Sequence, residues 1–417
     1  MISFDYIREN TEKAKEGFAA KKCAVDVEAL LALDEAYRSA LAATEQLRAQ
    51  RNAISDEIAT ASQEERPAKI KEAEEIKAKL QESEQRLDEA TDKRDEAVRS
   101  LPNLPFDVVP RGEDESANEV LRSVGAVAEM PFEVKDSSQL GEMHDLIDTE
   151  RAAKVSGSRF GYIKNEAALL EFALVRLALD EAAKEGFSPI VPPVLIGEKA
   201  MRGLGYLDKE PDQIYHLEED DLYLVATAEH AIVPMLSGET LEASEAPKRY
   251  IGFSSAFRRE AGTYGKDTKG ILRVHQFDKV EMVTFATPET SNDEHQLMLS
   301  IQERLMQKLE IPYQVVHVCT GDMGFTAANQ YDIESWIPSE GRYRETHSTS
   351  NTTDFQSRRL GIRVKMGEGS EFAHVLNGTA FAIGRTLIAL LENHQQADGS
   401  IVIPEALRPY TGFDRIG

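Results

Sequence analysis

Residues 27–100 carry the pattern that most constrains the fold. Nine positions in the first half of this segment, beginning at Leu30, and eight in the second half, beginning at Ile76, follow alternating steps of three and four residues. This heptad spacing aligns one seam of side chains along each of two helices. The polar break between them ends at Pro67, a residue tolerated in the first turn of a new helix. The pattern predicts an antiparallel helical hairpin with about 35 residues in each helix and a length of roughly 50 Å.

The seam of this arm is partly polar, and the arm as a whole is acidic. Thr44, Arg51, Ser83 and Arg94 occupy seam positions, and residues 31–100 contain 12 Lys or Arg against 17 Asp or Glu. Because RNA-binding surfaces are usually basic, RNA binding by the arm does not follow from its composition. A dimerisation coiled coil or a simple spacer would explain the pattern as well.

The length and composition of the chain fit two or three domains. With 417 residues, of which 41% are hydrophobic and 29% charged, the chain can bury a large core. It contains no apolar run of about 18 residues, so no membrane span is expected, and its charged N-terminus lacks the apolar core of a secretory signal. Cys23 and Cys319 provide neither a disulfide framework nor a zinc cluster. These features predict a cytoplasmic protein, although the net charge of −25 argues on average against nucleic acid binding.

A linker and an α+β domain are expected after the arm. Residues 100–118 are rich in proline and polar residues, which is typical of a linker. A helical pattern over residues 164–186 follows, and then come many short β-rich runs with few helices between them. Such closely spaced strands favour an antiparallel sheet flanked by helices over a doubly wound parallel sheet.

The stretch from Phe257 to Glu281 concentrates basic residues within an acidic chain. Two strands joined by its Gly-rich loop would form a pocket for a polyphosphate, because the planar guanidinium of arginine binds two phosphate oxygens at once. An exposed charged hairpin is the alternative. The stretch has four acids against six basic residues, which are Arg258, Arg259, Lys266, Lys269, Arg273 and Lys279.

Another arginine, Arg385, is expected in the first turn of a helix that begins near Ala382. There it would oppose the helix dipole, which favours anions at that end. The chain has no Walker-type GxxxxGK[ST] and no strand-linked GxGxxG motif, so ATP binding would depend on arginines and metal. Arg385 and the helix N-terminus would then hold a phosphate together. A salt-bridged surface arginine explains the pattern equally well.

Several longer strings resemble the signature motifs of a known enzyme family. FRREAG, a Gly-rich loop and RVHQFDKVE (257–281) resemble motif 2 of the class II aminoacyl-tRNA synthetases, in its seryl-tRNA synthetase form. NGTAFAIGRTL (377–387) resembles motif 3, and GFSPIVPPVL (186–195) resembles motif 1 more loosely, as the dimer-forming element. The N-terminal start, the hairpin and residues 319–338 also match the family's layout. The resemblance, to the bacterial type, covers nearly the full chain.

The resemblance implies a role in nucleotide binding for each matching residue. Arg258 would contact the α-phosphate of ATP and the carboxylate of serine, and Arg385 would hold the γ-phosphate, which makes these two the expected catalytic residues. Glu260 would face the adenine, and Phe277 would stack on it. The full expected ATP-binding set is Arg258, Arg259, Glu260, Val274, Phe277, Glu345, Thr346, His347, Ser348 and Arg385.

The resemblance also implies a serine pocket. Thr227 and Glu229 would bind the amino group of serine, and Glu281 and Thr379 would read its hydroxyl. Glu229, Glu281 and Glu345 are expected on strands, where solvent-facing acids are the alternative. The expected serine-binding set is Thr227, Ala228, Glu229, Glu281 and Thr379.

The implied activity is serine activation followed by tRNA charging. L-Serine and ATP would form seryl-adenylate, and the seryl group would pass to the terminal ribose of tRNA(Ser), and of tRNA(Sec) where it is present. ATP is a substrate, Mg²⁺ would be bound by Glu345 and Ser348, whose hard oxygens suit that ion, and no zinc is expected. The implied protein is a homodimer. Its parts would be an N-terminal tRNA-binding domain (1–106), a linker (107–118) and a class II catalytic domain (119–417).

The chain departs from the common bacterial pattern at three places. His347 stands where a small hydroxyl residue is usual, Thr379 replaces the serine of NGS, and ATAEH (226–230) replaces PTAEV. None of these changes removes a group that the chemistry needs. Two other roles stay open: an amino acid:carrier-protein ligase, whose relatives lack the hairpin and use zinc, and a non-catalytic paralogue, against which Arg258, Glu345 and Arg385 argue.

Overall fold

The computed structural model describes residues 1–262 and 270–417. Lys266 and Lys269 of the predicted phosphate-binding loop lie outside these described residues. The chain divides into two compact units, residues 1–102 and 103–417. The predicted linker, residues 107–118, lies within the second unit, where Val109 is buried.

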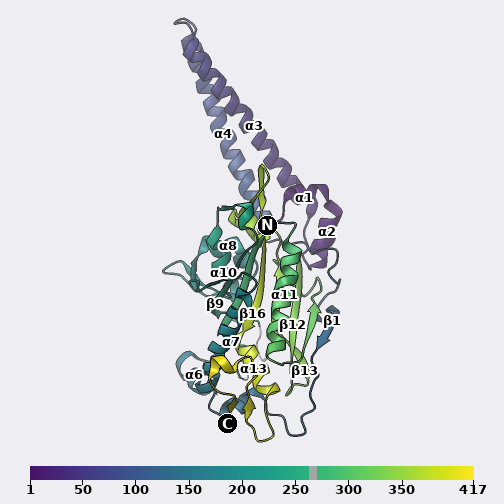
Figure 1. Cartoon of the computed structure of the whole chain (residues 1–417). Coiled ribbons are helices and arrows are strands. Elements are labelled where there is room, and N and C mark those ends of the chain that lie inside the picture. The colour runs from purple at the N-terminus through teal and green to yellow at the C-terminus, as the bar shows by residue number, and fades with distance from the viewer. Residues whose placement is uncertain (263–269) are drawn as a thin grey trace. The chain divides into compact units, whose positions relative to one another are not determined.

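The first unit is helical and contains the predicted hairpin. Helix α3 begins after Asp26, whose carboxylate accepts a hydrogen bond from the Ala29 amide and caps the helix. Helix α4 has Pro67 in its first turn, as the sequence predicts. Each helix has 34 residues, and the two run side by side (Figure 1). The four helices of this unit are α1 (Phe4–Glu9), α2 (Thr11–Ala20), α3 (Val27–Thr60) and α4 (Arg66–Arg99).

The polar seam positions of the hairpin pair with one another. Halfway along, the hydroxyls of Thr44 and Ser83 lie 2.8 Å apart and share a hydrogen bond. Near the base, Asp34 is only 1% exposed and forms ion pairs with Arg8 of α1 and Arg94 of α4. The seam is therefore held by a few apolar contacts and by polar groups that find partners inside the unit.

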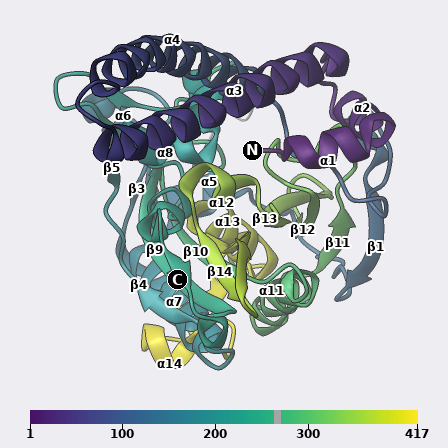
Figure 2. The same cartoon turned by 90° about the horizontal axis from the view of Figure 1, so that it is seen from above.

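The second unit is built on an eight-stranded sheet. All of its strand pairs are antiparallel except that between β4 and β9, which is parallel and lies at one edge. Figure 2 shows β9, β10, β12 and β13 from the end of the sheet. In spatial order the strands are β1 (Glu119–Val124), β11 (Tyr313–His317), β12 (Asn329–Ile337), β13 (Arg342–Asn351), β16 (His374–Ala382), β10 (Gln276–Ala286), β9 (Lys248–Phe257) and β4 (Ser188–Ile190).

Three helices cover one face of this sheet and form the main core with it. They are α7 (Asn165–Ala183), α11 (Ser291–Lys308) and α13 (Ile383–Asn393). Val280 and Met282 of β10 point into this core, because alternate residues of a strand face the same side. Lys279 and Glu281 therefore face the opposite side of the sheet. The predicted α+β architecture, a helical hairpin followed by a domain with a largely antiparallel sheet and helices, is confirmed.

A smaller apolar cluster lies on the other face, beyond the polar residues of β10. It combines Val283 and Phe285 with short helices and strands. One prediction fails here: Glu229 begins a short helix, α10, and does not lie on a strand. These short elements include β5 (Leu195–Gly197), β7 (Leu222–Leu224), α8 (Glu198–Leu204), α9 (Tyr206–Lys209), α10 (Glu229–Ile232) and α12 (Phe355–Leu360).

Two one-residue irregularities interrupt the ladder at the centre of the sheet. Between β12 and β13, Ile333 lies opposite His347 and Glu334 opposite Glu345, which leaves Thr346 unpaired. Between β10 and β16, Ala380 is left unpaired in the same way. Such bulges reverse the alternation of side chains along the bulged strand.

Within the described residues, none of the helices combines the length and the apolar character that crossing a membrane requires.

Candidate active site

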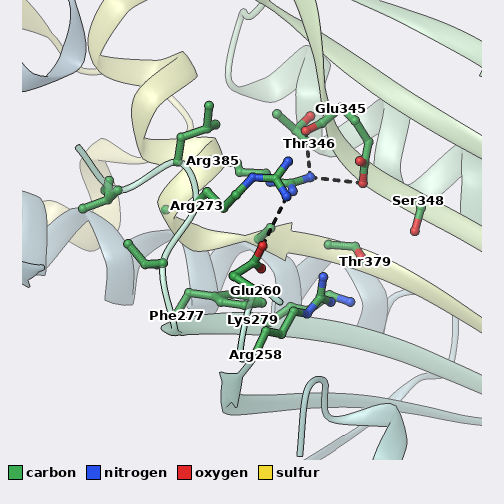
Figure 3. Close-up of a pocket in the computed structure, with 15 residues that line it drawn as sticks. Arg258, Glu260, Arg273, Phe277, Lys279, Glu345, Thr346, Ser348, Thr379 and Arg385 are labelled. Atoms are coloured by element: carbon green, nitrogen blue, oxygen red, sulfur yellow. Dashed lines mark hydrogen bonds and ion pairs between the residues drawn. The ribbon is translucent and has the colours of Figure 1, made fainter. Parts of the chain in front are cut away.

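The main candidate site is a pocket on the sheet face opposite α7, α11 and α13. Arg258 enters it from the residue after β9, Lys279 from β10, Thr379 from β16 and Arg385 from the first turn of α13. Figure 3 shows these side chains converging. The complete lining is Arg258, Glu260, Ile271, Leu272, Arg273, Val274, Phe277, Lys279, Glu345, Thr346, Ser348, Thr379, Ala382, Gly384 and Arg385.

The two arginines that the sequence singled out both lie in this pocket. The guanidinium of Arg258 lies over the ring of Phe277 at 5.2 Å, and its Nε donates to the Ala226 carbonyl at 3.4 Å. Arg385 pairs with Glu345, with 3.1 Å between Nη1 and Oε1. Burial acts to raise the pKa of Glu345, but the charges of Arg385 and Arg258 outweigh it, so that the pKa lies below its usual value. Glu345 is therefore ionised at neutral pH.

Arg273 also lines the pocket, although it was not among the predicted site residues. Its Nη1 lies 3.2 Å from Glu260 Oε2, and this ion pair orients both side chains at the rim (Figure 3). A second, polar groove shares Arg273, Glu345 and Arg385 with the pocket and adds Arg342 and Arg344. The surplus of basic residues in the stretch 257–281 was the signal that could have identified Arg273.

The predicted serine-binding residues form a connected polar group beside this pocket. Thr379 Oγ1 donates to Glu281 Oε2 at 3.4 Å. Lys279, which the sequence analysis did not assign to the site, forms an ion pair with Glu281 and donates to Thr227 Oγ1 at 3.2 Å. Glu281 and Thr379 face each other because the bulge at Ala380 brings them opposite one another.

Glu229 is the second acid of this polar group. It is 3% exposed, and its Oε1 accepts a hydrogen bond from Gln356 Nε2 at 2.6 Å. Burial raises the pKa of Glu229 to about 7, and the nearby Glu281 acts in the same direction. The hydrogen bond from Gln356 and the charge of Lys279 oppose this rise. Glu229 is therefore poised to change charge near neutral pH.

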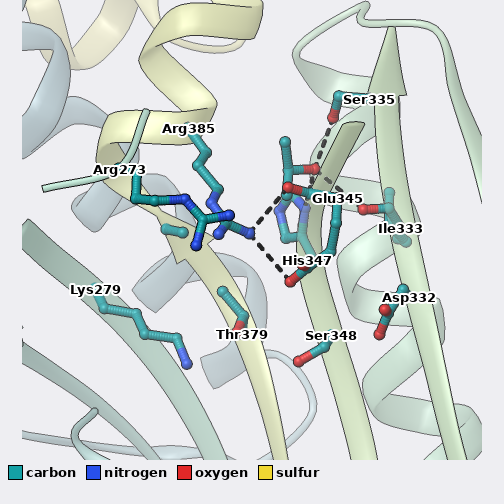
Figure 4. A network of polar contacts seen from close by, with 12 residues as sticks. Arg273, Lys279, Asp332, Ile333, Ser335, Glu345, His347, Ser348, Thr379 and Arg385 are labelled. Carbon is teal, nitrogen blue, oxygen red and sulfur yellow. Dashed lines mark hydrogen bonds and ion pairs between the residues drawn. The ribbon is translucent and has the colours of Figure 1, made fainter. Parts of the chain in front are cut away.

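Glu345 and Ser348 provide hard oxygen atoms on one face of β13. Three residues apart, they would face opposite sides of a regular strand, but the extra residue at Thr346 places both on the pocket face, opposite Glu334 and Asp332 (Figure 4). The described residues contain no cluster of three His, Cys, Asp or Glu that could hold a metal ion. Mg²⁺ commonly takes one or two protein ligands and completes its shell with phosphate and water, so this pair fits that ion.

Three residues predicted for the site lie neither in the pocket lining nor in the polar group beside it. The guanidinium of Arg259 lies over the Tyr215 ring at 5.4 Å, and Ala228 is buried in the turn before α10. His347 is 1% exposed and points to the core side, where its Nδ1 shares a hydrogen bond with Thr346 Oγ1 at 2.8 Å. Burial lowers the pKa of His347 to about 4, so that its ring is neutral at pH 7 and adds no charge to the site. Any influence of His347 on the pocket is exerted through the bulged residue Thr346, to which it is hydrogen-bonded.

Two family profiles match the chain. Residues 1–105 match the profile described as seryl-tRNA synthetase N-terminal domain. Residues 214–394 match the core domain of class II tRNA synthetases for G, H, P, S and T. The matches correspond to the hairpin unit and to the part of the second unit that carries the pocket.

Relatives match over the full length. A serine–tRNA ligase of Acidothermus cellulolyticus is 47% identical over 99% of this chain and 99% of its own. The crystal structure of seryl-tRNA synthetase from Pyrococcus horikoshii complexed with ATP has a TM-score of 0.91 and 39% identity, covering 100% of this chain and 99% of that one. The cytoplasmic serine–tRNA ligase of Naegleria fowleri in complex with AMP gives a TM-score of 0.87 at 30% identity, covering 99% and 96%.

Proposed function

The chain belongs to the seryl-tRNA synthetase family, and we propose the residues with which it makes seryl-adenylate from L-serine and ATP and charges tRNA(Ser). The observation that carries this assignment is the convergence of Arg258, Glu345 and Arg385 in one pocket. Beside this pocket lies a buried polar group in which Thr379 donates to Glu281. A non-catalytic paralogue would have no need for all three.

The arginine-lined part of the pocket binds ATP in this proposal. Adenine stacks on Phe277, whose ring also lies 5.2 Å from the guanidinium of Arg258, and Val274 lines the base-binding wall. Arg258 neutralises the α-phosphate and Arg385 the γ-phosphate, since a guanidinium can bind two phosphate oxygens at once. Arg273 adds a third positive charge where the pocket opens into the polar groove. The groove gives the outer phosphates room.

The buried polar group binds serine. The ammonium of serine pairs with the buried carboxylate of Glu229 and donates to the hydroxyl of Thr227. Glu281 and Thr379 read the serine hydroxyl. A pocket that hydrogen-bonds a substrate hydroxyl rejects the analogue lacking it, because its buried polar groups then lose a partner.

Mg²⁺ is the proposed metal, with Glu345 and Ser348 as its protein ligands. When bound there, it would neutralise charge on the phosphates. The Arg385 guanidinium holds the Glu345 carboxylate from the other side, with 3.1 Å between Nη1 and Oε1. This contact fixes the orientation of the carboxylate.

The chemistry is two displacement steps that positioned charges accelerate. A carboxylate oxygen of serine attacks the α-phosphorus of ATP, and pyrophosphate leaves with the electron pair of the broken P–O bond. A terminal ribose hydroxyl of tRNA then attacks the acyl carbon, and AMP leaves. Arg258 stabilises the extra negative charge on the α-phosphate, and alignment of the two reactants supplies much of the rate.

The remaining partners are proposed from other surfaces of the chain. The hairpin of the first unit binds tRNA(Ser), and tRNA(Sec) where that tRNA is present.

A homodimer forms through α7 and β4. Phe172 is 64% exposed on α7, Val191 is 81% exposed after β4, and β4 ends the described sheet. α7 and β4 contact each other, and exposed apolar side chains that lie together favour a protein interface. Charging of tRNA also places the protein in the cytoplasm.

The test is ATP–pyrophosphate exchange with each of the twenty amino acids in the absence of tRNA. We expect exchange with serine, and loss of at least about 100-fold in the Arg258→Ala variant, because one group that stabilises transition-state charge is worth roughly that much. Arg363→Ala is the matched control, since Arg363 contacts Ser370 and Phe372 away from the pocket. Exchange with another amino acid, or near-normal exchange in Arg258→Ala, would contradict the assignment.

A further inference from the structure

Lys279 lies at the junction between the arginine-lined pocket and the buried carboxylates. It lies on β10, two residues before Glu281, so that both side chains point to the same face of the sheet. Its side chain is 9% exposed and that of Glu281 2% exposed. In Figure 4 its ammonium points away from Arg273 and Arg385.

The contacts of Lys279 fix the orientation of Glu281. The Lys279 ammonium forms an ion pair with Glu281 Oε2, and the same oxygen accepts a hydrogen bond from Thr379 Oγ1 at 3.4 Å. The ammonium also donates to Thr227 Oγ1 at 3.2 Å. Lys279 therefore connects the residue proposed for the amino group of serine with the residue proposed for its hydroxyl.

The contact with Lys279 matters because Glu281 is a buried acid beside the pocket, 2% exposed. Burying a carboxylate without a partner is expensive, and the ion pair with Lys279 gives Glu281 that partner. A hydrogen bond weakens steeply when donor and acceptor are misaligned. The orientation of the Glu281 carboxylate therefore sets how well it accepts from the serine hydroxyl.

We propose that Lys279 is a positioning residue for amino-acid selection: by pairing with Glu281 it holds that carboxylate in the orientation that accepts the hydroxyl of serine. This inference rests on the proposed serine-activating function and deepens it. Lys279 then acts on the choice between serine and alanine, and it acts through Glu281.

The alternative role for Lys279 is direct substrate binding, either to the carboxylate that all amino acids have or to a phosphate of ATP. An ammonium that binds the substrate carboxylate or a phosphate would affect serine and alanine equally. The ratio of kcat/KM for serine to that for alanine therefore separates the two roles, whereas the loss of activity alone does not.

The experiment measures this ratio by pyrophosphate exchange in a double-mutant cycle. We expect Lys279→Met to lower the serine-to-alanine ratio roughly tenfold, the contribution of one well-oriented hydrogen bond to a carboxylate. In the Glu281→Gln background, where the carboxylate is absent, the same change should lower the ratio less than about twofold. Lys279→Arg keeps a cation and should keep the ratio within about threefold of wild type.

Folding of each variant is checked by the shift of its melting temperature with ATP. If Lys279→Met does not fold, Lys279→Gln, which is also neutral but keeps a hydrogen-bond donor, takes its place in the cycle. An unchanged ratio, an equal fall in both backgrounds, or a fall in Lys279→Arg as large as in the neutral variant would overturn the inference. Absence of serine-dependent exchange in the wild type would instead contradict the proposed function itself.

Discussion

At the scale of single residues, Glu229 couples the proposed serine site to pH. Its buried carboxyl has a pKa of about 7, so it is largely protonated below that pH and ionised above it. The ammonium of serine pairs with the ionised form. We therefore expect the KM for serine to rise as pH falls below 7, approaching about tenfold per pH unit, because each unit removes that fraction of the binding-competent form.

This pH dependence is measured by pyrophosphate exchange between pH 5.5 and 8.5 at saturating ATP. In Glu229→Gln the profile should become flat, and the KM for ATP should change little in either protein, because Glu229 does not line the ATP pocket. A wild-type KM for serine that is constant over this range would contradict the pairing with Glu229.

Thr379 provides the second residue-scale prediction. Its hydroxyl donates to Glu281, and valine has nearly the same shape without that hydroxyl. We expect Thr379→Val to lower the serine-to-alanine ratio about three- to tenfold, the usual contribution of one hydrogen bond. Thr284→Val on β10 is the matched control, because Thr284 is fully buried and its hydroxyl donates to the Met298 sulfur on the core side of the sheet. A ratio that moves equally in both variants would show that packing, not the hydroxyl, is being measured.

The sequence predicts which residue types belong to the site better than it predicts their contacts. Arg258, Glu345 and Arg385 are found together in the pocket, and the motif strings carry that information. Lys279 and Arg273 were counted only as positive charges, because a charge count does not say which carboxylate each would meet. Arg259 was expected to bind ATP but lies over Tyr215, since neighbouring residues at a strand end can point in opposite directions.

At the scale of elements, the bulges at Thr346 and Ala380 are what the sequence patterns could not predict. Each moves one residue out of the ladder and so decides which side chains face the pocket. Ser335 and Thr346 share a hydrogen bond of 2.7 Å between their hydroxyls that fixes the first bulge from the core side. No local composition marks these positions, because the geometry depends on the paired strand. The long helices α3, α4 and α7, in contrast, follow directly from periodicity.

The hairpin permits a shortened variant with a defined join. Thr44 and Ser83 are hydrogen-bonded, so removing residues 45–82 and closing the gap with a short Gly-rich turn leaves the base of the arm intact. We expect this variant to retain serine-dependent exchange within about twofold, because the pocket belongs to the other compact unit. Charging of tRNA(Ser) should fall by at least about 100-fold, the loss expected when a large contact surface is removed.

Aminoacylation with radiolabelled serine measures the charging of tRNA(Ser). Pyrophosphate exchange with the same preparation serves as its internal control. Charging that survives the deletion would mean that the arm is a spacer. A parallel fall in exchange would instead indicate that the deletion damages the catalytic unit.

At the scale of the whole molecule, the proposed dimer predicts the mass of the protein in solution. Light scattering should give twice the chain mass of 46.4 kDa. Phe172→Asp should shift the protein toward the monomer at micromolar concentration, because it replaces an exposed aromatic ring on the proposed interface with a charge. Val108→Asp is the control, since Val108 is 70% exposed outside α7 and β4. A monomeric wild-type protein would contradict the proposed interface.

The division into an arm and a catalytic unit is the part of the molecule that the sequence predicted most fully. Heptad spacing over residues 27–100 does not depend on distant contacts, and both helices have nearly the predicted length. The boundary of the first unit is harder to predict from the sequence. The predicted domain ended at residue 106, whereas the compact units divide after residue 102. Asn103 shows why, because its side-chain amide donates to the carbonyls of Thr326 and Thr352 within the second unit.

The ion pairs of Asp34 give the arm the mechanics of a beam that is clamped at one end. At the base, Asp34 ties α3 to Arg8 of α1 and Arg94 of α4, whereas the outer part has only two helices and few buried side chains. Bending of such a beam is smallest at the clamp, and displacement accumulates toward the free tip. Thermal bending therefore displaces the tip more than the base, which keeps its geometry. The tip samples a larger volume, within which it can meet a diffusing tRNA.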